Sequence, residues 1–411
     1  MLCLMVFDSS VAFPGYWAAA PVISTALILM FGAHSTRFGP SRLLSLRPLL
    51  FIGLISYSLY LVHWPALVLP QAGIGYFHPL PLWSTLGIAV LCVPLAWLLF
   101  RFVEDPARRT RWLSEARPSK TVLLAAGATL SAAVIGIAGL TVAKVAPMAT
   151  DTSVAAPVMS VAPDGTAFVP ANLSPSLQDA ASDKPSIYDD GCHLDFAEVD
   201  SRGCTFGKSS DTVIALFGDS HAAQWFPALK AWVEEKGYTL ETHTKSSCPS
   251  IELEIKVNGV PFENCEIWRD GVIDHLRQSP PSLVILANFY HTVGSEDPDA
   301  WSAALRRSLV ELTQFNVVML ADTPYMGQNP SICLSANLTN ALECSRPRSE
   351  AMASPIREAE VAAASETGTP LIDLNSYFCS NLICPPIVGN VAVYRDPHHV
   401  SSVFSEFLAS P

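Results

Sequence analysis

The segment VIALFGDSHAAQW, residues 213–225, decides the fold of the carboxyl-terminal half of the chain. An apolar run typical of a buried strand ends at Gly218, and a helical pattern begins directly after it. Similar runs alternate over the rest of this half. The strand-like runs are Val213–Phe217, Thr239–His243, Leu283–Ala287, Val317–Ala321 and Leu371–Leu374, and the helix-like stretches are 221–236, 263–278, 298–314 and 347–367. This alternation predicts a three-layer α/β fold with a parallel sheet, whose ligands bind beyond the carboxyl ends of the strands.

Two polar segments of this half carry side chains suited to nucleophilic chemistry. The glycine that ends the first strand permits a sharp turn, which puts Ser220 at the carboxyl edge of the sheet. A serine there is also a common helix N-cap, so the GDS triplet alone leaves both interpretations open. Near the end of the chain, YRDPHHVSS at 394–402 spaces Asp396 and His399 three residues apart. Because a nucleophilic serine needs a base and the base needs an orienting acceptor, we expect His399 to take the proton and Asp396 to orient it, with His398 as the adjacent alternative.

The amino-terminal part of the chain has the composition of a membrane protein. Half of all residues are hydrophobic and only 15% are charged, whereas a soluble domain carries about 25% charged residues. Four uncharged apolar runs are each long enough to cross a hydrocarbon core as a helix. They are Phe13–Ala33, Pro48–Leu69, Leu80–Phe100 and Thr121–Ala143. We therefore predict about four transmembrane helices within residues 1–144.

Charge divides the chain into two halves. Residues 1–144 hold 10 of the 25 Lys and Arg and 4 of the 37 Asp and Glu, a net charge of +6 that leaves −18 for the remainder. Basic residues gather in the links at 37–47 and 101–120, while the link at 70–79 has none. The positive-inside rule puts both basic links in the cytoplasm and everything after Lys144 outside. The acidic half offers no basic stripe, so we expect no nucleic-acid partner.

A linker and a set of paired cysteines follow the membrane part. Residues 145–190 are rich in Ala, Pro, Ser and Asp and lack hydrophobic periodicity, which predicts a flexible linker. An even number of cysteines beyond it, outside the cytoplasm, indicates disulfides. The close pairs are Cys192/Cys204, Cys248/Cys265, Cys333/Cys344 and Cys379/Cys384. We expect sequential pairing among the 105 arrangements that eight cysteines allow. A zinc site is the rival interpretation, although the spacings are irregular and no C-x-x-C pair occurs.

Three stretches of the membrane half resemble membrane acyltransferase family 3. GLISYSLYLVHWP at 53–65 and FVEDPARR at 102–109 are similar to the closing helices of that family, and FPGYWAAAPVISTALI at 13–28 is similar to the helix before them. The resemblance covers residues 10–145, the last third of such a domain, without the family's amino-terminal helix. It implies a missing upstream membrane portion, or a separate subunit, that delivers the acyl group.

The pairing of GDSH at 218–221 with DxxH at 396–399 resembles the SGNH hydrolase superfamily, in the variant often fused behind acyltransferase family 3 domains. The resemblance covers about residues 190–411. It implies a flavodoxin-like domain in which Ser220 is the nucleophile, His399 the base and Asp396 the acid.

The sequence departs from the superfamily pattern at the expected oxyanion hole. The second block normally offers a glycine amide, but KSSCP at 245–249 has no glycine, and in the third block, LANFYH at 286–291, only Asn288 matches. We expect Asn288 to donate to the oxyanion, with a loop-turn role as the alternative. Asp219 and His221 are expected to support the turn rather than to react.

Two further polar groups lie in the membrane half. His63, beside Trp64 near the end of an apolar run, is a candidate for a membrane site, because histidine is rare there. Anchoring of the helix at the membrane interface is the alternative. Glu104 with Arg108 and Arg109 is expected to form a charge cluster at the cytoplasmic end of a helix.

These observations predict three parts: a partial acyltransferase family 3 membrane region at 1–144, a linker at 145–190 and an extracytoplasmic SGNH domain at 191–411. The expected function is acetyl transfer to hydroxyls of an envelope polysaccharide, such as O-antigen or peptidoglycan, through an acyl-enzyme. A membrane-tethered carbohydrate O-acyl esterase and an inactive glycan-binding module that partners a separate acyltransferase are the alternatives.

We expect no metal and no cofactor in the SGNH domain, with acetyl-CoA as the ultimate donor where a full membrane domain is present. The expected location is the cytoplasmic membrane, with several passes through the bilayer.

The charge asymmetry predicts the topology of the chain. The link at 101–120 should face the cytoplasm, and residues 145–411 should face outward, because basic links are retained inside. Protease added to intact spheroplasts should therefore digest the carboxyl-terminal half and spare the basic link. Protection of residues 211–411 in intact spheroplasts would contradict this topology.

Overall fold

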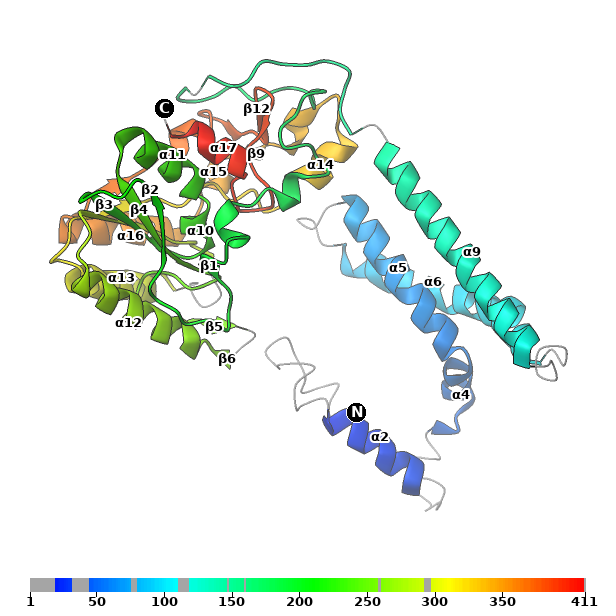
Figure 1. The fold of residues 1–411 in the computed structure, drawn as a ribbon. Helices are drawn as coiled ribbons and strands as arrows, with labels where there is room; N and C mark the ends of the chain where they lie inside the picture. Colours follow the sequence, from blue (N-terminus) through cyan, green and yellow to red (C-terminus); the bar gives the residue numbers. More distant parts are fainter. Residues whose placement is uncertain are drawn as a thin grey trace. The chain divides into compact units, whose positions relative to one another are not determined.

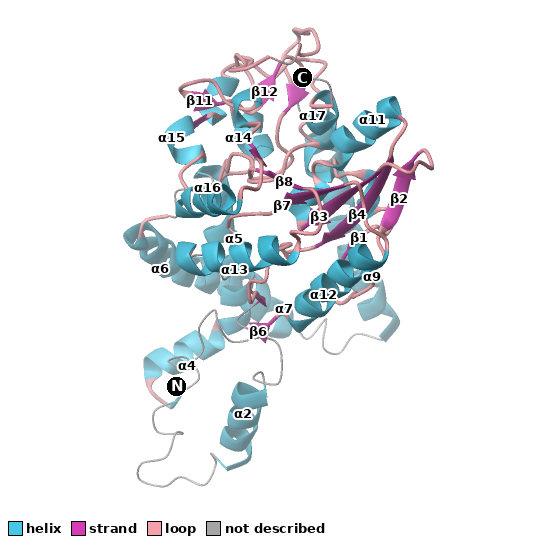
Figure 2. Ribbon diagram, turned by 90° about the vertical axis from the view of Figure 1, so that its left-hand side faces the viewer, coloured by secondary structure: helices cyan, strands magenta, loops and turns pink. Residues whose placement is uncertain are grey.

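The computed structural model describes residues 19–31, 44–74, 80–109, 118–145, 148–158, 160–257, 260–291 and 297–409. It contains two compact units, Met1–Pro147 and Met148–Pro411. In its described residues the first unit is built of helices alone, while the second contains a sheet and its covering helices (Figure 1 and Figure 2).

Most helices of the first unit are apolar. The described helices are α2 (Ala19–Phe31), α4 (Arg47–Leu54), α5 (Ser56–Ile74), α6 (Leu82–Leu99), a π-helix at Phe100–Glu104, α7 (Asp105–Arg109) and α9 (Pro118–Val145). A small buried cluster of Ile55, Ala96 and Phe100 lies where α5 packs against α6. Many large apolar side chains on these helices, such as Trp64 and Trp83, are exposed in the unit. Such surface needs an apolar neighbour, either lipid or protein.

The structure supports part of the predicted membrane region. Among the described residues one continuous helix, Leu82–Arg109, is long and apolar enough to cross a membrane. α4 and α5 pass the same test only as a pair bent by 72°, and Ala125–Ala138 is a shorter apolar stretch. Residues 13–18 and 32–33 of the first predicted run lie outside the described residues. Four transmembrane helices therefore stay a prediction.

The polar groups around the π-helix pair with one another. Arg108 lies 3.2 Å from Glu104, and Arg109 lies 2.6 Å from Asp105. The Ser58 hydroxyl donates to Glu104 at 2.7 Å and so joins α5 to the π-helix. The expected charge cluster of Glu104 and Arg108 is thus present, whereas Arg109 pairs with a different carboxylate.

The second unit is built on the predicted parallel sheet. Its strands lie in the order β1 (His193–Leu194), β4 (Thr239–Lys245), β3 (Val213–Gly218), β7 (Leu283–Ala287), β8 (Val317–Leu320) and β10 (Leu371–Ile372), all parallel, and β2 (Cys204–Gly207) pairs antiparallel with β4. All five predicted strands are present, with ends that differ by at most two residues. The order reverses between β3 and β7, the position at which sheets of this kind bind ligands.

Helices cover both faces of the sheet, as Figure 1 shows for α11 on one side and α12 and α13 on the other. One face carries α10 (Ser220–Ala223), α11 (Phe226–Lys236) and α17 (Ser402–Phe407), and the other carries α12 (Glu263–Gln278), α13 (Pro298–Glu311) and α16 (Pro355–Thr367). Ile214 and Leu216 of β3 point into the first core, whereas Ala215 and Phe217 point into the second. This alternation with period two explains the continuous apolar run of a strand buried on both sides.

Two predicted helices are each broken in two. α10 and α11 replace the helix expected at 221–236, and α15 (Arg348–Ala351) and α16 replace the one expected at 347–367. A proline stands in the first turn of both α11 and α16, where its fixed φ favours the start of a new helix. The other elements include α14 (Pro330–Ala336) and three two-stranded antiparallel sheets: β5 (Lys256–Val257) with β6 (Val260–Pro261), β9 (Arg346–Pro347) with β11 (Ile383–Cys384), and β12 (Ile387–Val388) with β13 (Val391–Ala392).

The prediction of a flexible linker at 145–190 is wrong for the described residues from 148 onward. Val169 and Leu177 are buried in a small core with Leu334 and Ile387. The backbone N–H groups of this segment donate to distant carbonyls, as in Ala162 to Ser376, Thr166 to Ile387 and Val169 to Leu338. An aperiodic segment can still be buried when its backbone finds partners elsewhere in the fold, which a search for periodicity does not detect.

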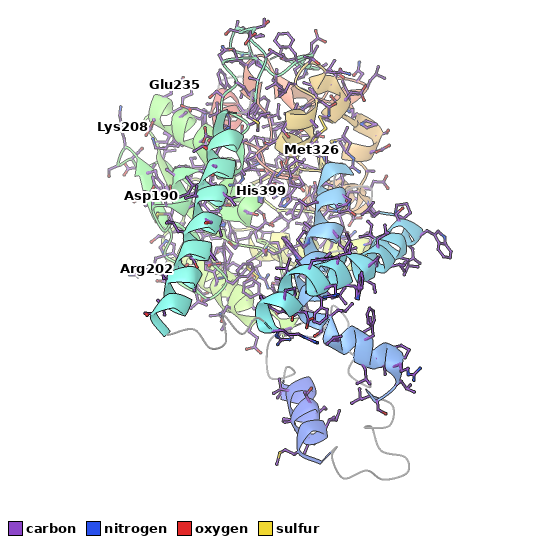
Figure 3. All side chains as sticks on the ribbon, turned by 90° about the vertical axis from the view of Figure 1, so that its right-hand side faces the viewer. Asp190, Arg202, Lys208, Glu235, Met326 and His399 are labelled. Atoms are coloured by element: carbon purple, nitrogen blue, oxygen red, sulfur yellow. A yellow bond between two sulfur atoms is a disulfide. The ribbon has the colours of Figure 1, made fainter. Side chains whose placement is uncertain are left out.

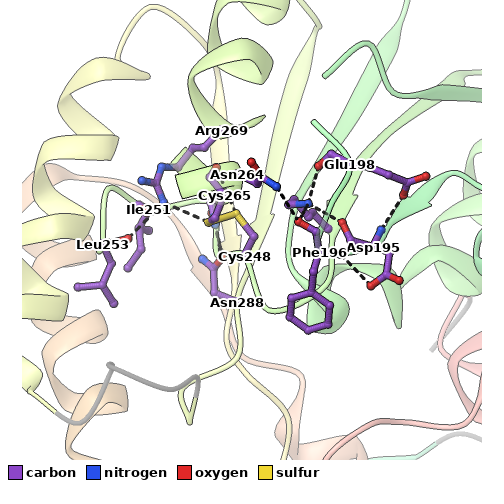
Figure 4. The surroundings of a disulfide bond; sticks show 12 residues. Asp195, Phe196, Glu198, Cys248, Ile251, Leu253, Asn264, Cys265, Arg269 and Asn288 are labelled. Atoms are coloured by element: carbon purple, nitrogen blue, oxygen red, sulfur yellow. Dashed lines mark hydrogen bonds between the residues drawn. A yellow bond between two sulfur atoms is a disulfide. The ribbon is translucent and has the colours of Figure 1, made fainter. Parts of the chain in front are cut away.

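The structure confirms sequential pairing of the eight cysteines. The disulfides are Cys192–Cys204, Cys248–Cys265, Cys333–Cys344 and Cys379–Cys384. Cys92 is a buried free cysteine, and Cys3 lies outside the described residues. Figure 4 shows the second of these bonds beside Arg269, whose guanidinium donates to the carbonyl of Ile251 at 2.6 Å.

Loop length predicts how much two of these bonds stabilise the fold. Replacing both Cys248 and Cys265 by Ala opens a loop of 17 residues and should lower the free energy of unfolding by about 3 kcal/mol. The matched pair Cys379 and Cys384 closes only 5 residues, so its loss should cost about 2 kcal/mol. Urea unfolding followed by tryptophan fluorescence measures both. A larger loss for the shorter loop would contradict the ranking.

Candidate active site

The two residues before Ser220 place it at the carboxyl end of β3. Gly218 allows a close approach to the neighbouring strand, and Asp219 caps the helix that follows. A Cβ on Gly218 would lie 2.0 Å from the carbonyl oxygen of Ala287, so only glycine lets β3 and β7 approach here. Asp219 then caps α10, accepting from the His221 N–H at 2.7 Å. The Ser220 side chain stays partly exposed at the edge of the sheet.

The carboxylate of Asp219 joins two strands. Its second oxygen accepts from the N–H of Phe289, just beyond β7, at 2.9 Å. Burial raises the pKa of Asp219 to about 6, although the charge of His221 and the two N–H donors oppose this. These contacts support the expected role of Asp219 as a support of the turn.

Ser220, His399 and Asp396 form one hydrogen-bonded chain. Nε2 of His399 lies 2.8 Å from Ser220 Oγ, and its Nδ1 lies 2.6 Å from Asp396 Oδ2. The other carboxylate oxygen accepts from the backbone N–H groups of His398 and His399 at 3.0 and 2.8 Å. The fold thus brings together the three residues that the sequence singles out, over a separation of 179 residues. The alternative base, His398, makes no hydrogen bond to Ser220.

The electrostatics prepare His399 to accept a proton. Burial opposes the charge on Asp396, but the hydrogen bond and charge of His399 outweigh it and hold the pKa of Asp396 well below its usual value. Burial lowers the pKa of His399 to about 3, although Asp396 pulls it upward. At neutral pH the imidazole is therefore uncharged, with an acceptor nitrogen toward Ser220, as a general base requires.

Gln224, which sequence reasoning missed, holds the carboxyl-terminal segment in place. Its Oε1 accepts from the Val400 N–H at 2.8 Å, and its Nε2 donates to Thr323 Oγ1 at 3.2 Å. The Ser405 hydroxyl donates to its backbone carbonyl at 2.6 Å. The sequence does contain one signal for this role, because the polar amide of Gln224 interrupts the apolar residues that follow His221.

A second chain of polar side chains lies behind the first. Asp322, just beyond β8, accepts from His221 Nδ1 and from the Tyr290 N–H. His221 Nε2 lies 3.0 Å from His398 Nδ1. Burial opposes protonation of His221, but Asp322 outweighs it and raises the pKa of His221 above its ordinary value. His398, whose pKa burial lowers to about 4, is therefore neutral, accepts at Nδ1 and presents its Nε2–H.

Asn288 is the first residue after β7 and is buried. Its Oδ1 accepts from the Ser250 N–H at 2.7 Å and from the Ser250 hydroxyl at 3.1 Å, so its Nδ2 remains as a donor. Figure 4 shows Asn288 beside the Cys248–Cys265 disulfide. Asn288 is not among the residues that line the neighbouring pocket, and its oxyanion role stays a prediction.

Ser247 takes a backbone conformation in which glycine is usual. Its φ is 54°, in the left-handed region. Its N–H and that of Ser220 donate to no acceptor in the described part of the chain, and both residues line the pocket. The stretch without a glycine thus still offers a free backbone donor, which residue identity alone did not reveal.

The pocket has a volume of about 440 Å³ and lies at the carboxyl edge of the sheet. Its cationic side chains are Lys184, Lys256 and Arg395, and its other lining residues are Tyr188, Phe196, Asp219, Ser220, Ser246, Ser247, Ile255, Val257, Phe289, His291, Asp396, His398 and His399. Lys184 and Tyr188 come from the segment predicted as a linker. Arg395 donates to the Tyr188 hydroxyl at 3.3 Å and so ties that segment to the site. Figure 3 marks the position of His399 in the second unit.

His63, the candidate in the first unit, makes hydrogen bonds within its own helix. Its Nδ1 lies 2.8 Å from the Tyr60 carbonyl and 3.2 Å from that of Leu59. These contacts account for one ring nitrogen, and a membrane site at His63 stays a prediction.

Two groups of side chains have the spacing of metal ligands. In the described residues they are His221 with His398 and His399, and Glu241 with His243 and His275. Five of the six ring nitrogens of the first group are engaged with Asp322, Asp396, Ser220 or one another, and His398 Nε2 is the exception within the residues described. That arrangement suits proton transfer from a serine hydroxyl.

Comparison with known proteins bears on the second unit. A family model described as "SGNH domain (fused to AT3 domains)" matches residues 191–411, more than half of the chain. Among solved structures, the periplasmic domain of a lipopolysaccharide acetyltransferase from Salmonella ser. Paratyphi A is 20% identical, with a TM-score of 0.40, over 54% of this chain and 85% of that one. A likeness at this TM-score adds nothing to the interpretation of the site. No curated protein matches the chain.

The lowered pKa of His399 predicts how Ser220 reactivity depends on pH. Because the neutral base is lost only as the pH falls toward about 3, labelling of Ser220 by a fluorophosphonate should stay constant from pH 8 to pH 6. A histidine that titrates at 6.5 would lose about fourfold over the same range. The range stops at pH 6 because Asp219, with a pKa of about 6, takes up a proton there. A fourfold loss, with the circular dichroism unchanged, would contradict the prediction.

Proposed function

The chain belongs to the family of SGNH domains fused to AT3 domains, and on this premise we propose that it transfers an acetyl group to a hydroxyl of a cell-envelope polysaccharide. The observation that carries the proposal is the hydrogen-bonded chain of Ser220, His399 and Asp396 at the edge of an open pocket. A serine, a neutral imidazole and an ionised carboxylate in this order form the set that acyl transfer through a serine requires.

The first half of the reaction forms an acyl-enzyme. Ser220 Oγ attacks the acyl carbon of the donor, and its proton passes to His399 Nε2. The bond from the acyl carbon to the donor oxygen or sulfur then breaks, and the leaving group takes the proton from His399. The N–H groups of Ser220 and Ser247 and the Nδ2 of Asn288 are the proposed donors to the transient oxyanion.

The second half passes the acyl group to the acceptor. The sugar hydroxyl gives its proton to His399 while its oxygen attacks the acyl carbon. Ser220 Oγ leaves and recovers the proton, so the base ends as it began. Water in place of the sugar would make the protein an esterase, with the same three side chains.

The lining of the pocket supports a saccharide acceptor. Tyr188, Phe196 and Phe289 contribute aromatic side chains to the lining, and Lys184 and Arg395 lie over the ring of Tyr188. Pockets that bind sizeable organic ligands combine apolar walls with a few polar groups that fix orientation. The volume of this pocket is larger than an esterase would need to admit water as the only acceptor.

We further propose that the second unit works outside the cytoplasmic membrane, anchored by about four transmembrane helices in residues 1–144. The acyl group, with acetyl-CoA as its ultimate source, would reach Ser220 through an upstream membrane portion or a separate subunit. The basic links at 37–47 and 101–120 and the four disulfides support an extracytoplasmic location.

Turnover of a small acetyl ester by the purified chain in detergent tests the catalytic proposal. Ser220→Ala and His399→Ala should each lower kcat by at least about 10³-fold, and the double variant should be little worse, because the two residues act as one unit. Asp396→Asn should keep the fold but lose about 10⁴-fold through the wrong imidazole tautomer. Ser209→Ala, which removes an exposed hydroxyl outside the pocket, is the matched control and should keep full activity.

The products identify the acceptor. Acetylated sugar formed in the presence of an oligosaccharide supports the transferase, whereas free acetate alone supports the esterase. Wild-type turnover by Ser220→Ala would show that the proposed nucleophile is wrong. No turnover and no labelling of Ser220 would instead favour an inactive glycan-binding module.

A further inference from the structure

Three side chains converge between the sheet and α12, and none of them lines the Ser220 pocket. Glu241 and His243 are two residues apart on β4 and so point to the same face, which α12 covers with His275. Glu241 Oε1 lies 2.7 Å from His275 Nε2 and 3.4 Å from His243 Nε2. All three ligand atoms lie within 4.8 Å of one another.

The tautomer of His243 follows from its other neighbour. Its Nδ1 lies 3.0 Å from the carbonyl oxygen of Ser201, which can only accept, so Nδ1 carries the hydrogen. Nε2 of the neutral ring is then a lone pair. This atom is buried and has no hydrogen-bond partner among the residues that the structure describes.

The lone pair of His243 faces another acceptor. Glu241 Oε1 already accepts from His275 Nε2 at 2.7 Å, so this carboxylate is an acceptor toward both rings. A carboxylate oxygen and an imidazole lone pair 3.4 Å apart repel each other in a buried place. A cation between them removes that repulsion.

We propose that Glu241, His243 and His275 bind a divalent metal ion of the zinc class, with water at the fourth position. Imidazole and carboxylate are ligands that Zn²⁺ accepts at about 2.0–2.1 Å, and a tetrahedron of that size has edges of about 3.3–3.4 Å. The His243–Glu241 separation has that length, and the His275–Glu241 separation must open by about 0.6 Å. His275 retains a quarter of its exposure, which gives an ion and its water access from solvent.

The surroundings of His243 match those of metal-bound histidines. A ligating imidazole commonly donates its second N–H to a carbonyl, as His243 does to Ser201. Gly203 packs so closely that a Cβ there would lie 2.7 Å from His243 Cε1, so the ring has little room to turn. The Cys192–Cys204 disulfide closes the loop that carries these residues, which Arg202 marks in Figure 3. The ion would therefore fasten α12 to β4 and would act on stability, not on the chemistry at Ser220.

Thermal unfolding of the full chain in detergent, stripped of metal by EDTA, tests the site. Zn²⁺ at about a hundredfold excess over its dissociation constant should raise the midpoint by about 5–10 °C. Co²⁺ should give visible d–d absorption with one equivalent per chain. His275→Gln should lose both effects while it keeps an N–H for Glu241. His193→Gln, a buried imidazole on β1 outside the cluster, is the matched control and should retain both.

The remaining outcomes overturn the proposal. No shift with Zn²⁺ and no Co²⁺ absorption in the wild type means that no metal binds here. Effects that survive in His275→Gln mean that the ion binds elsewhere, for example at His221, His398 and His399. Stabilisation on acidification alone, abolished in Glu241→Gln and insensitive to metal, means that the cation is a proton on His243.

Discussion

The buried carboxylate of Asp219 is the constraint on which the candidate active site depends. One oxygen caps the short helix that begins at Ser220, and the other accepts from the Phe289 N–H beyond β7. Burying a carboxylate is unfavourable unless hydrogen bonds compensate for the lost water, and these two N–H donors supply that compensation. The Phe289 N–H also links the residue after β3 to the residues after β7, where the strand order reverses. Gly218 completes the arrangement, because any side chain there would collide with Ala287. The position of Ser220 is therefore set by β3 and β7, because the Asp219 carboxylate links the ends of both strands.

The base reaches the nucleophile through buried polar contacts of a different kind. The side chain of Gln224 accepts a hydrogen bond from the Val400 N–H and so holds the carboxyl-terminal segment beside α10. Asp322 and His221 lie behind this segment and hold His398 through a contact to its Nδ1. Burial of this assembly lowers the pKa of His399, so the environment that makes polar groups costly also keeps the base unprotonated.

Residues 148–190 change how the two parts of the chain are understood. Their composition is that of a tether, yet they complete a small core around Val169 and Leu177. Lys184 and Tyr188 from the same segment line the pocket, and Arg395 holds Tyr188 there. The segment that follows the helical unit in the sequence thus also forms one wall of the site in the second unit.

The sequence by itself determined the elements that depend on local pattern. Apolar runs with turn residues between them predicted all five main strands, close cysteine pairs predicted the disulfides, and short motifs singled out Ser220, Asp396 and His399. Only the tertiary structure decided what distant residues do to one another: the left-handed Ser247, the pairing of Asp322 with His221, the orphaned nitrogen of His243 and the burial of residues 148–190. The reason is physical. A strand or a tight turn is selected by interactions within a few residues, whereas a buried polar contact depends on which segments meet, and Asp322 and His221 meet across 101 residues with no periodic signal to announce it.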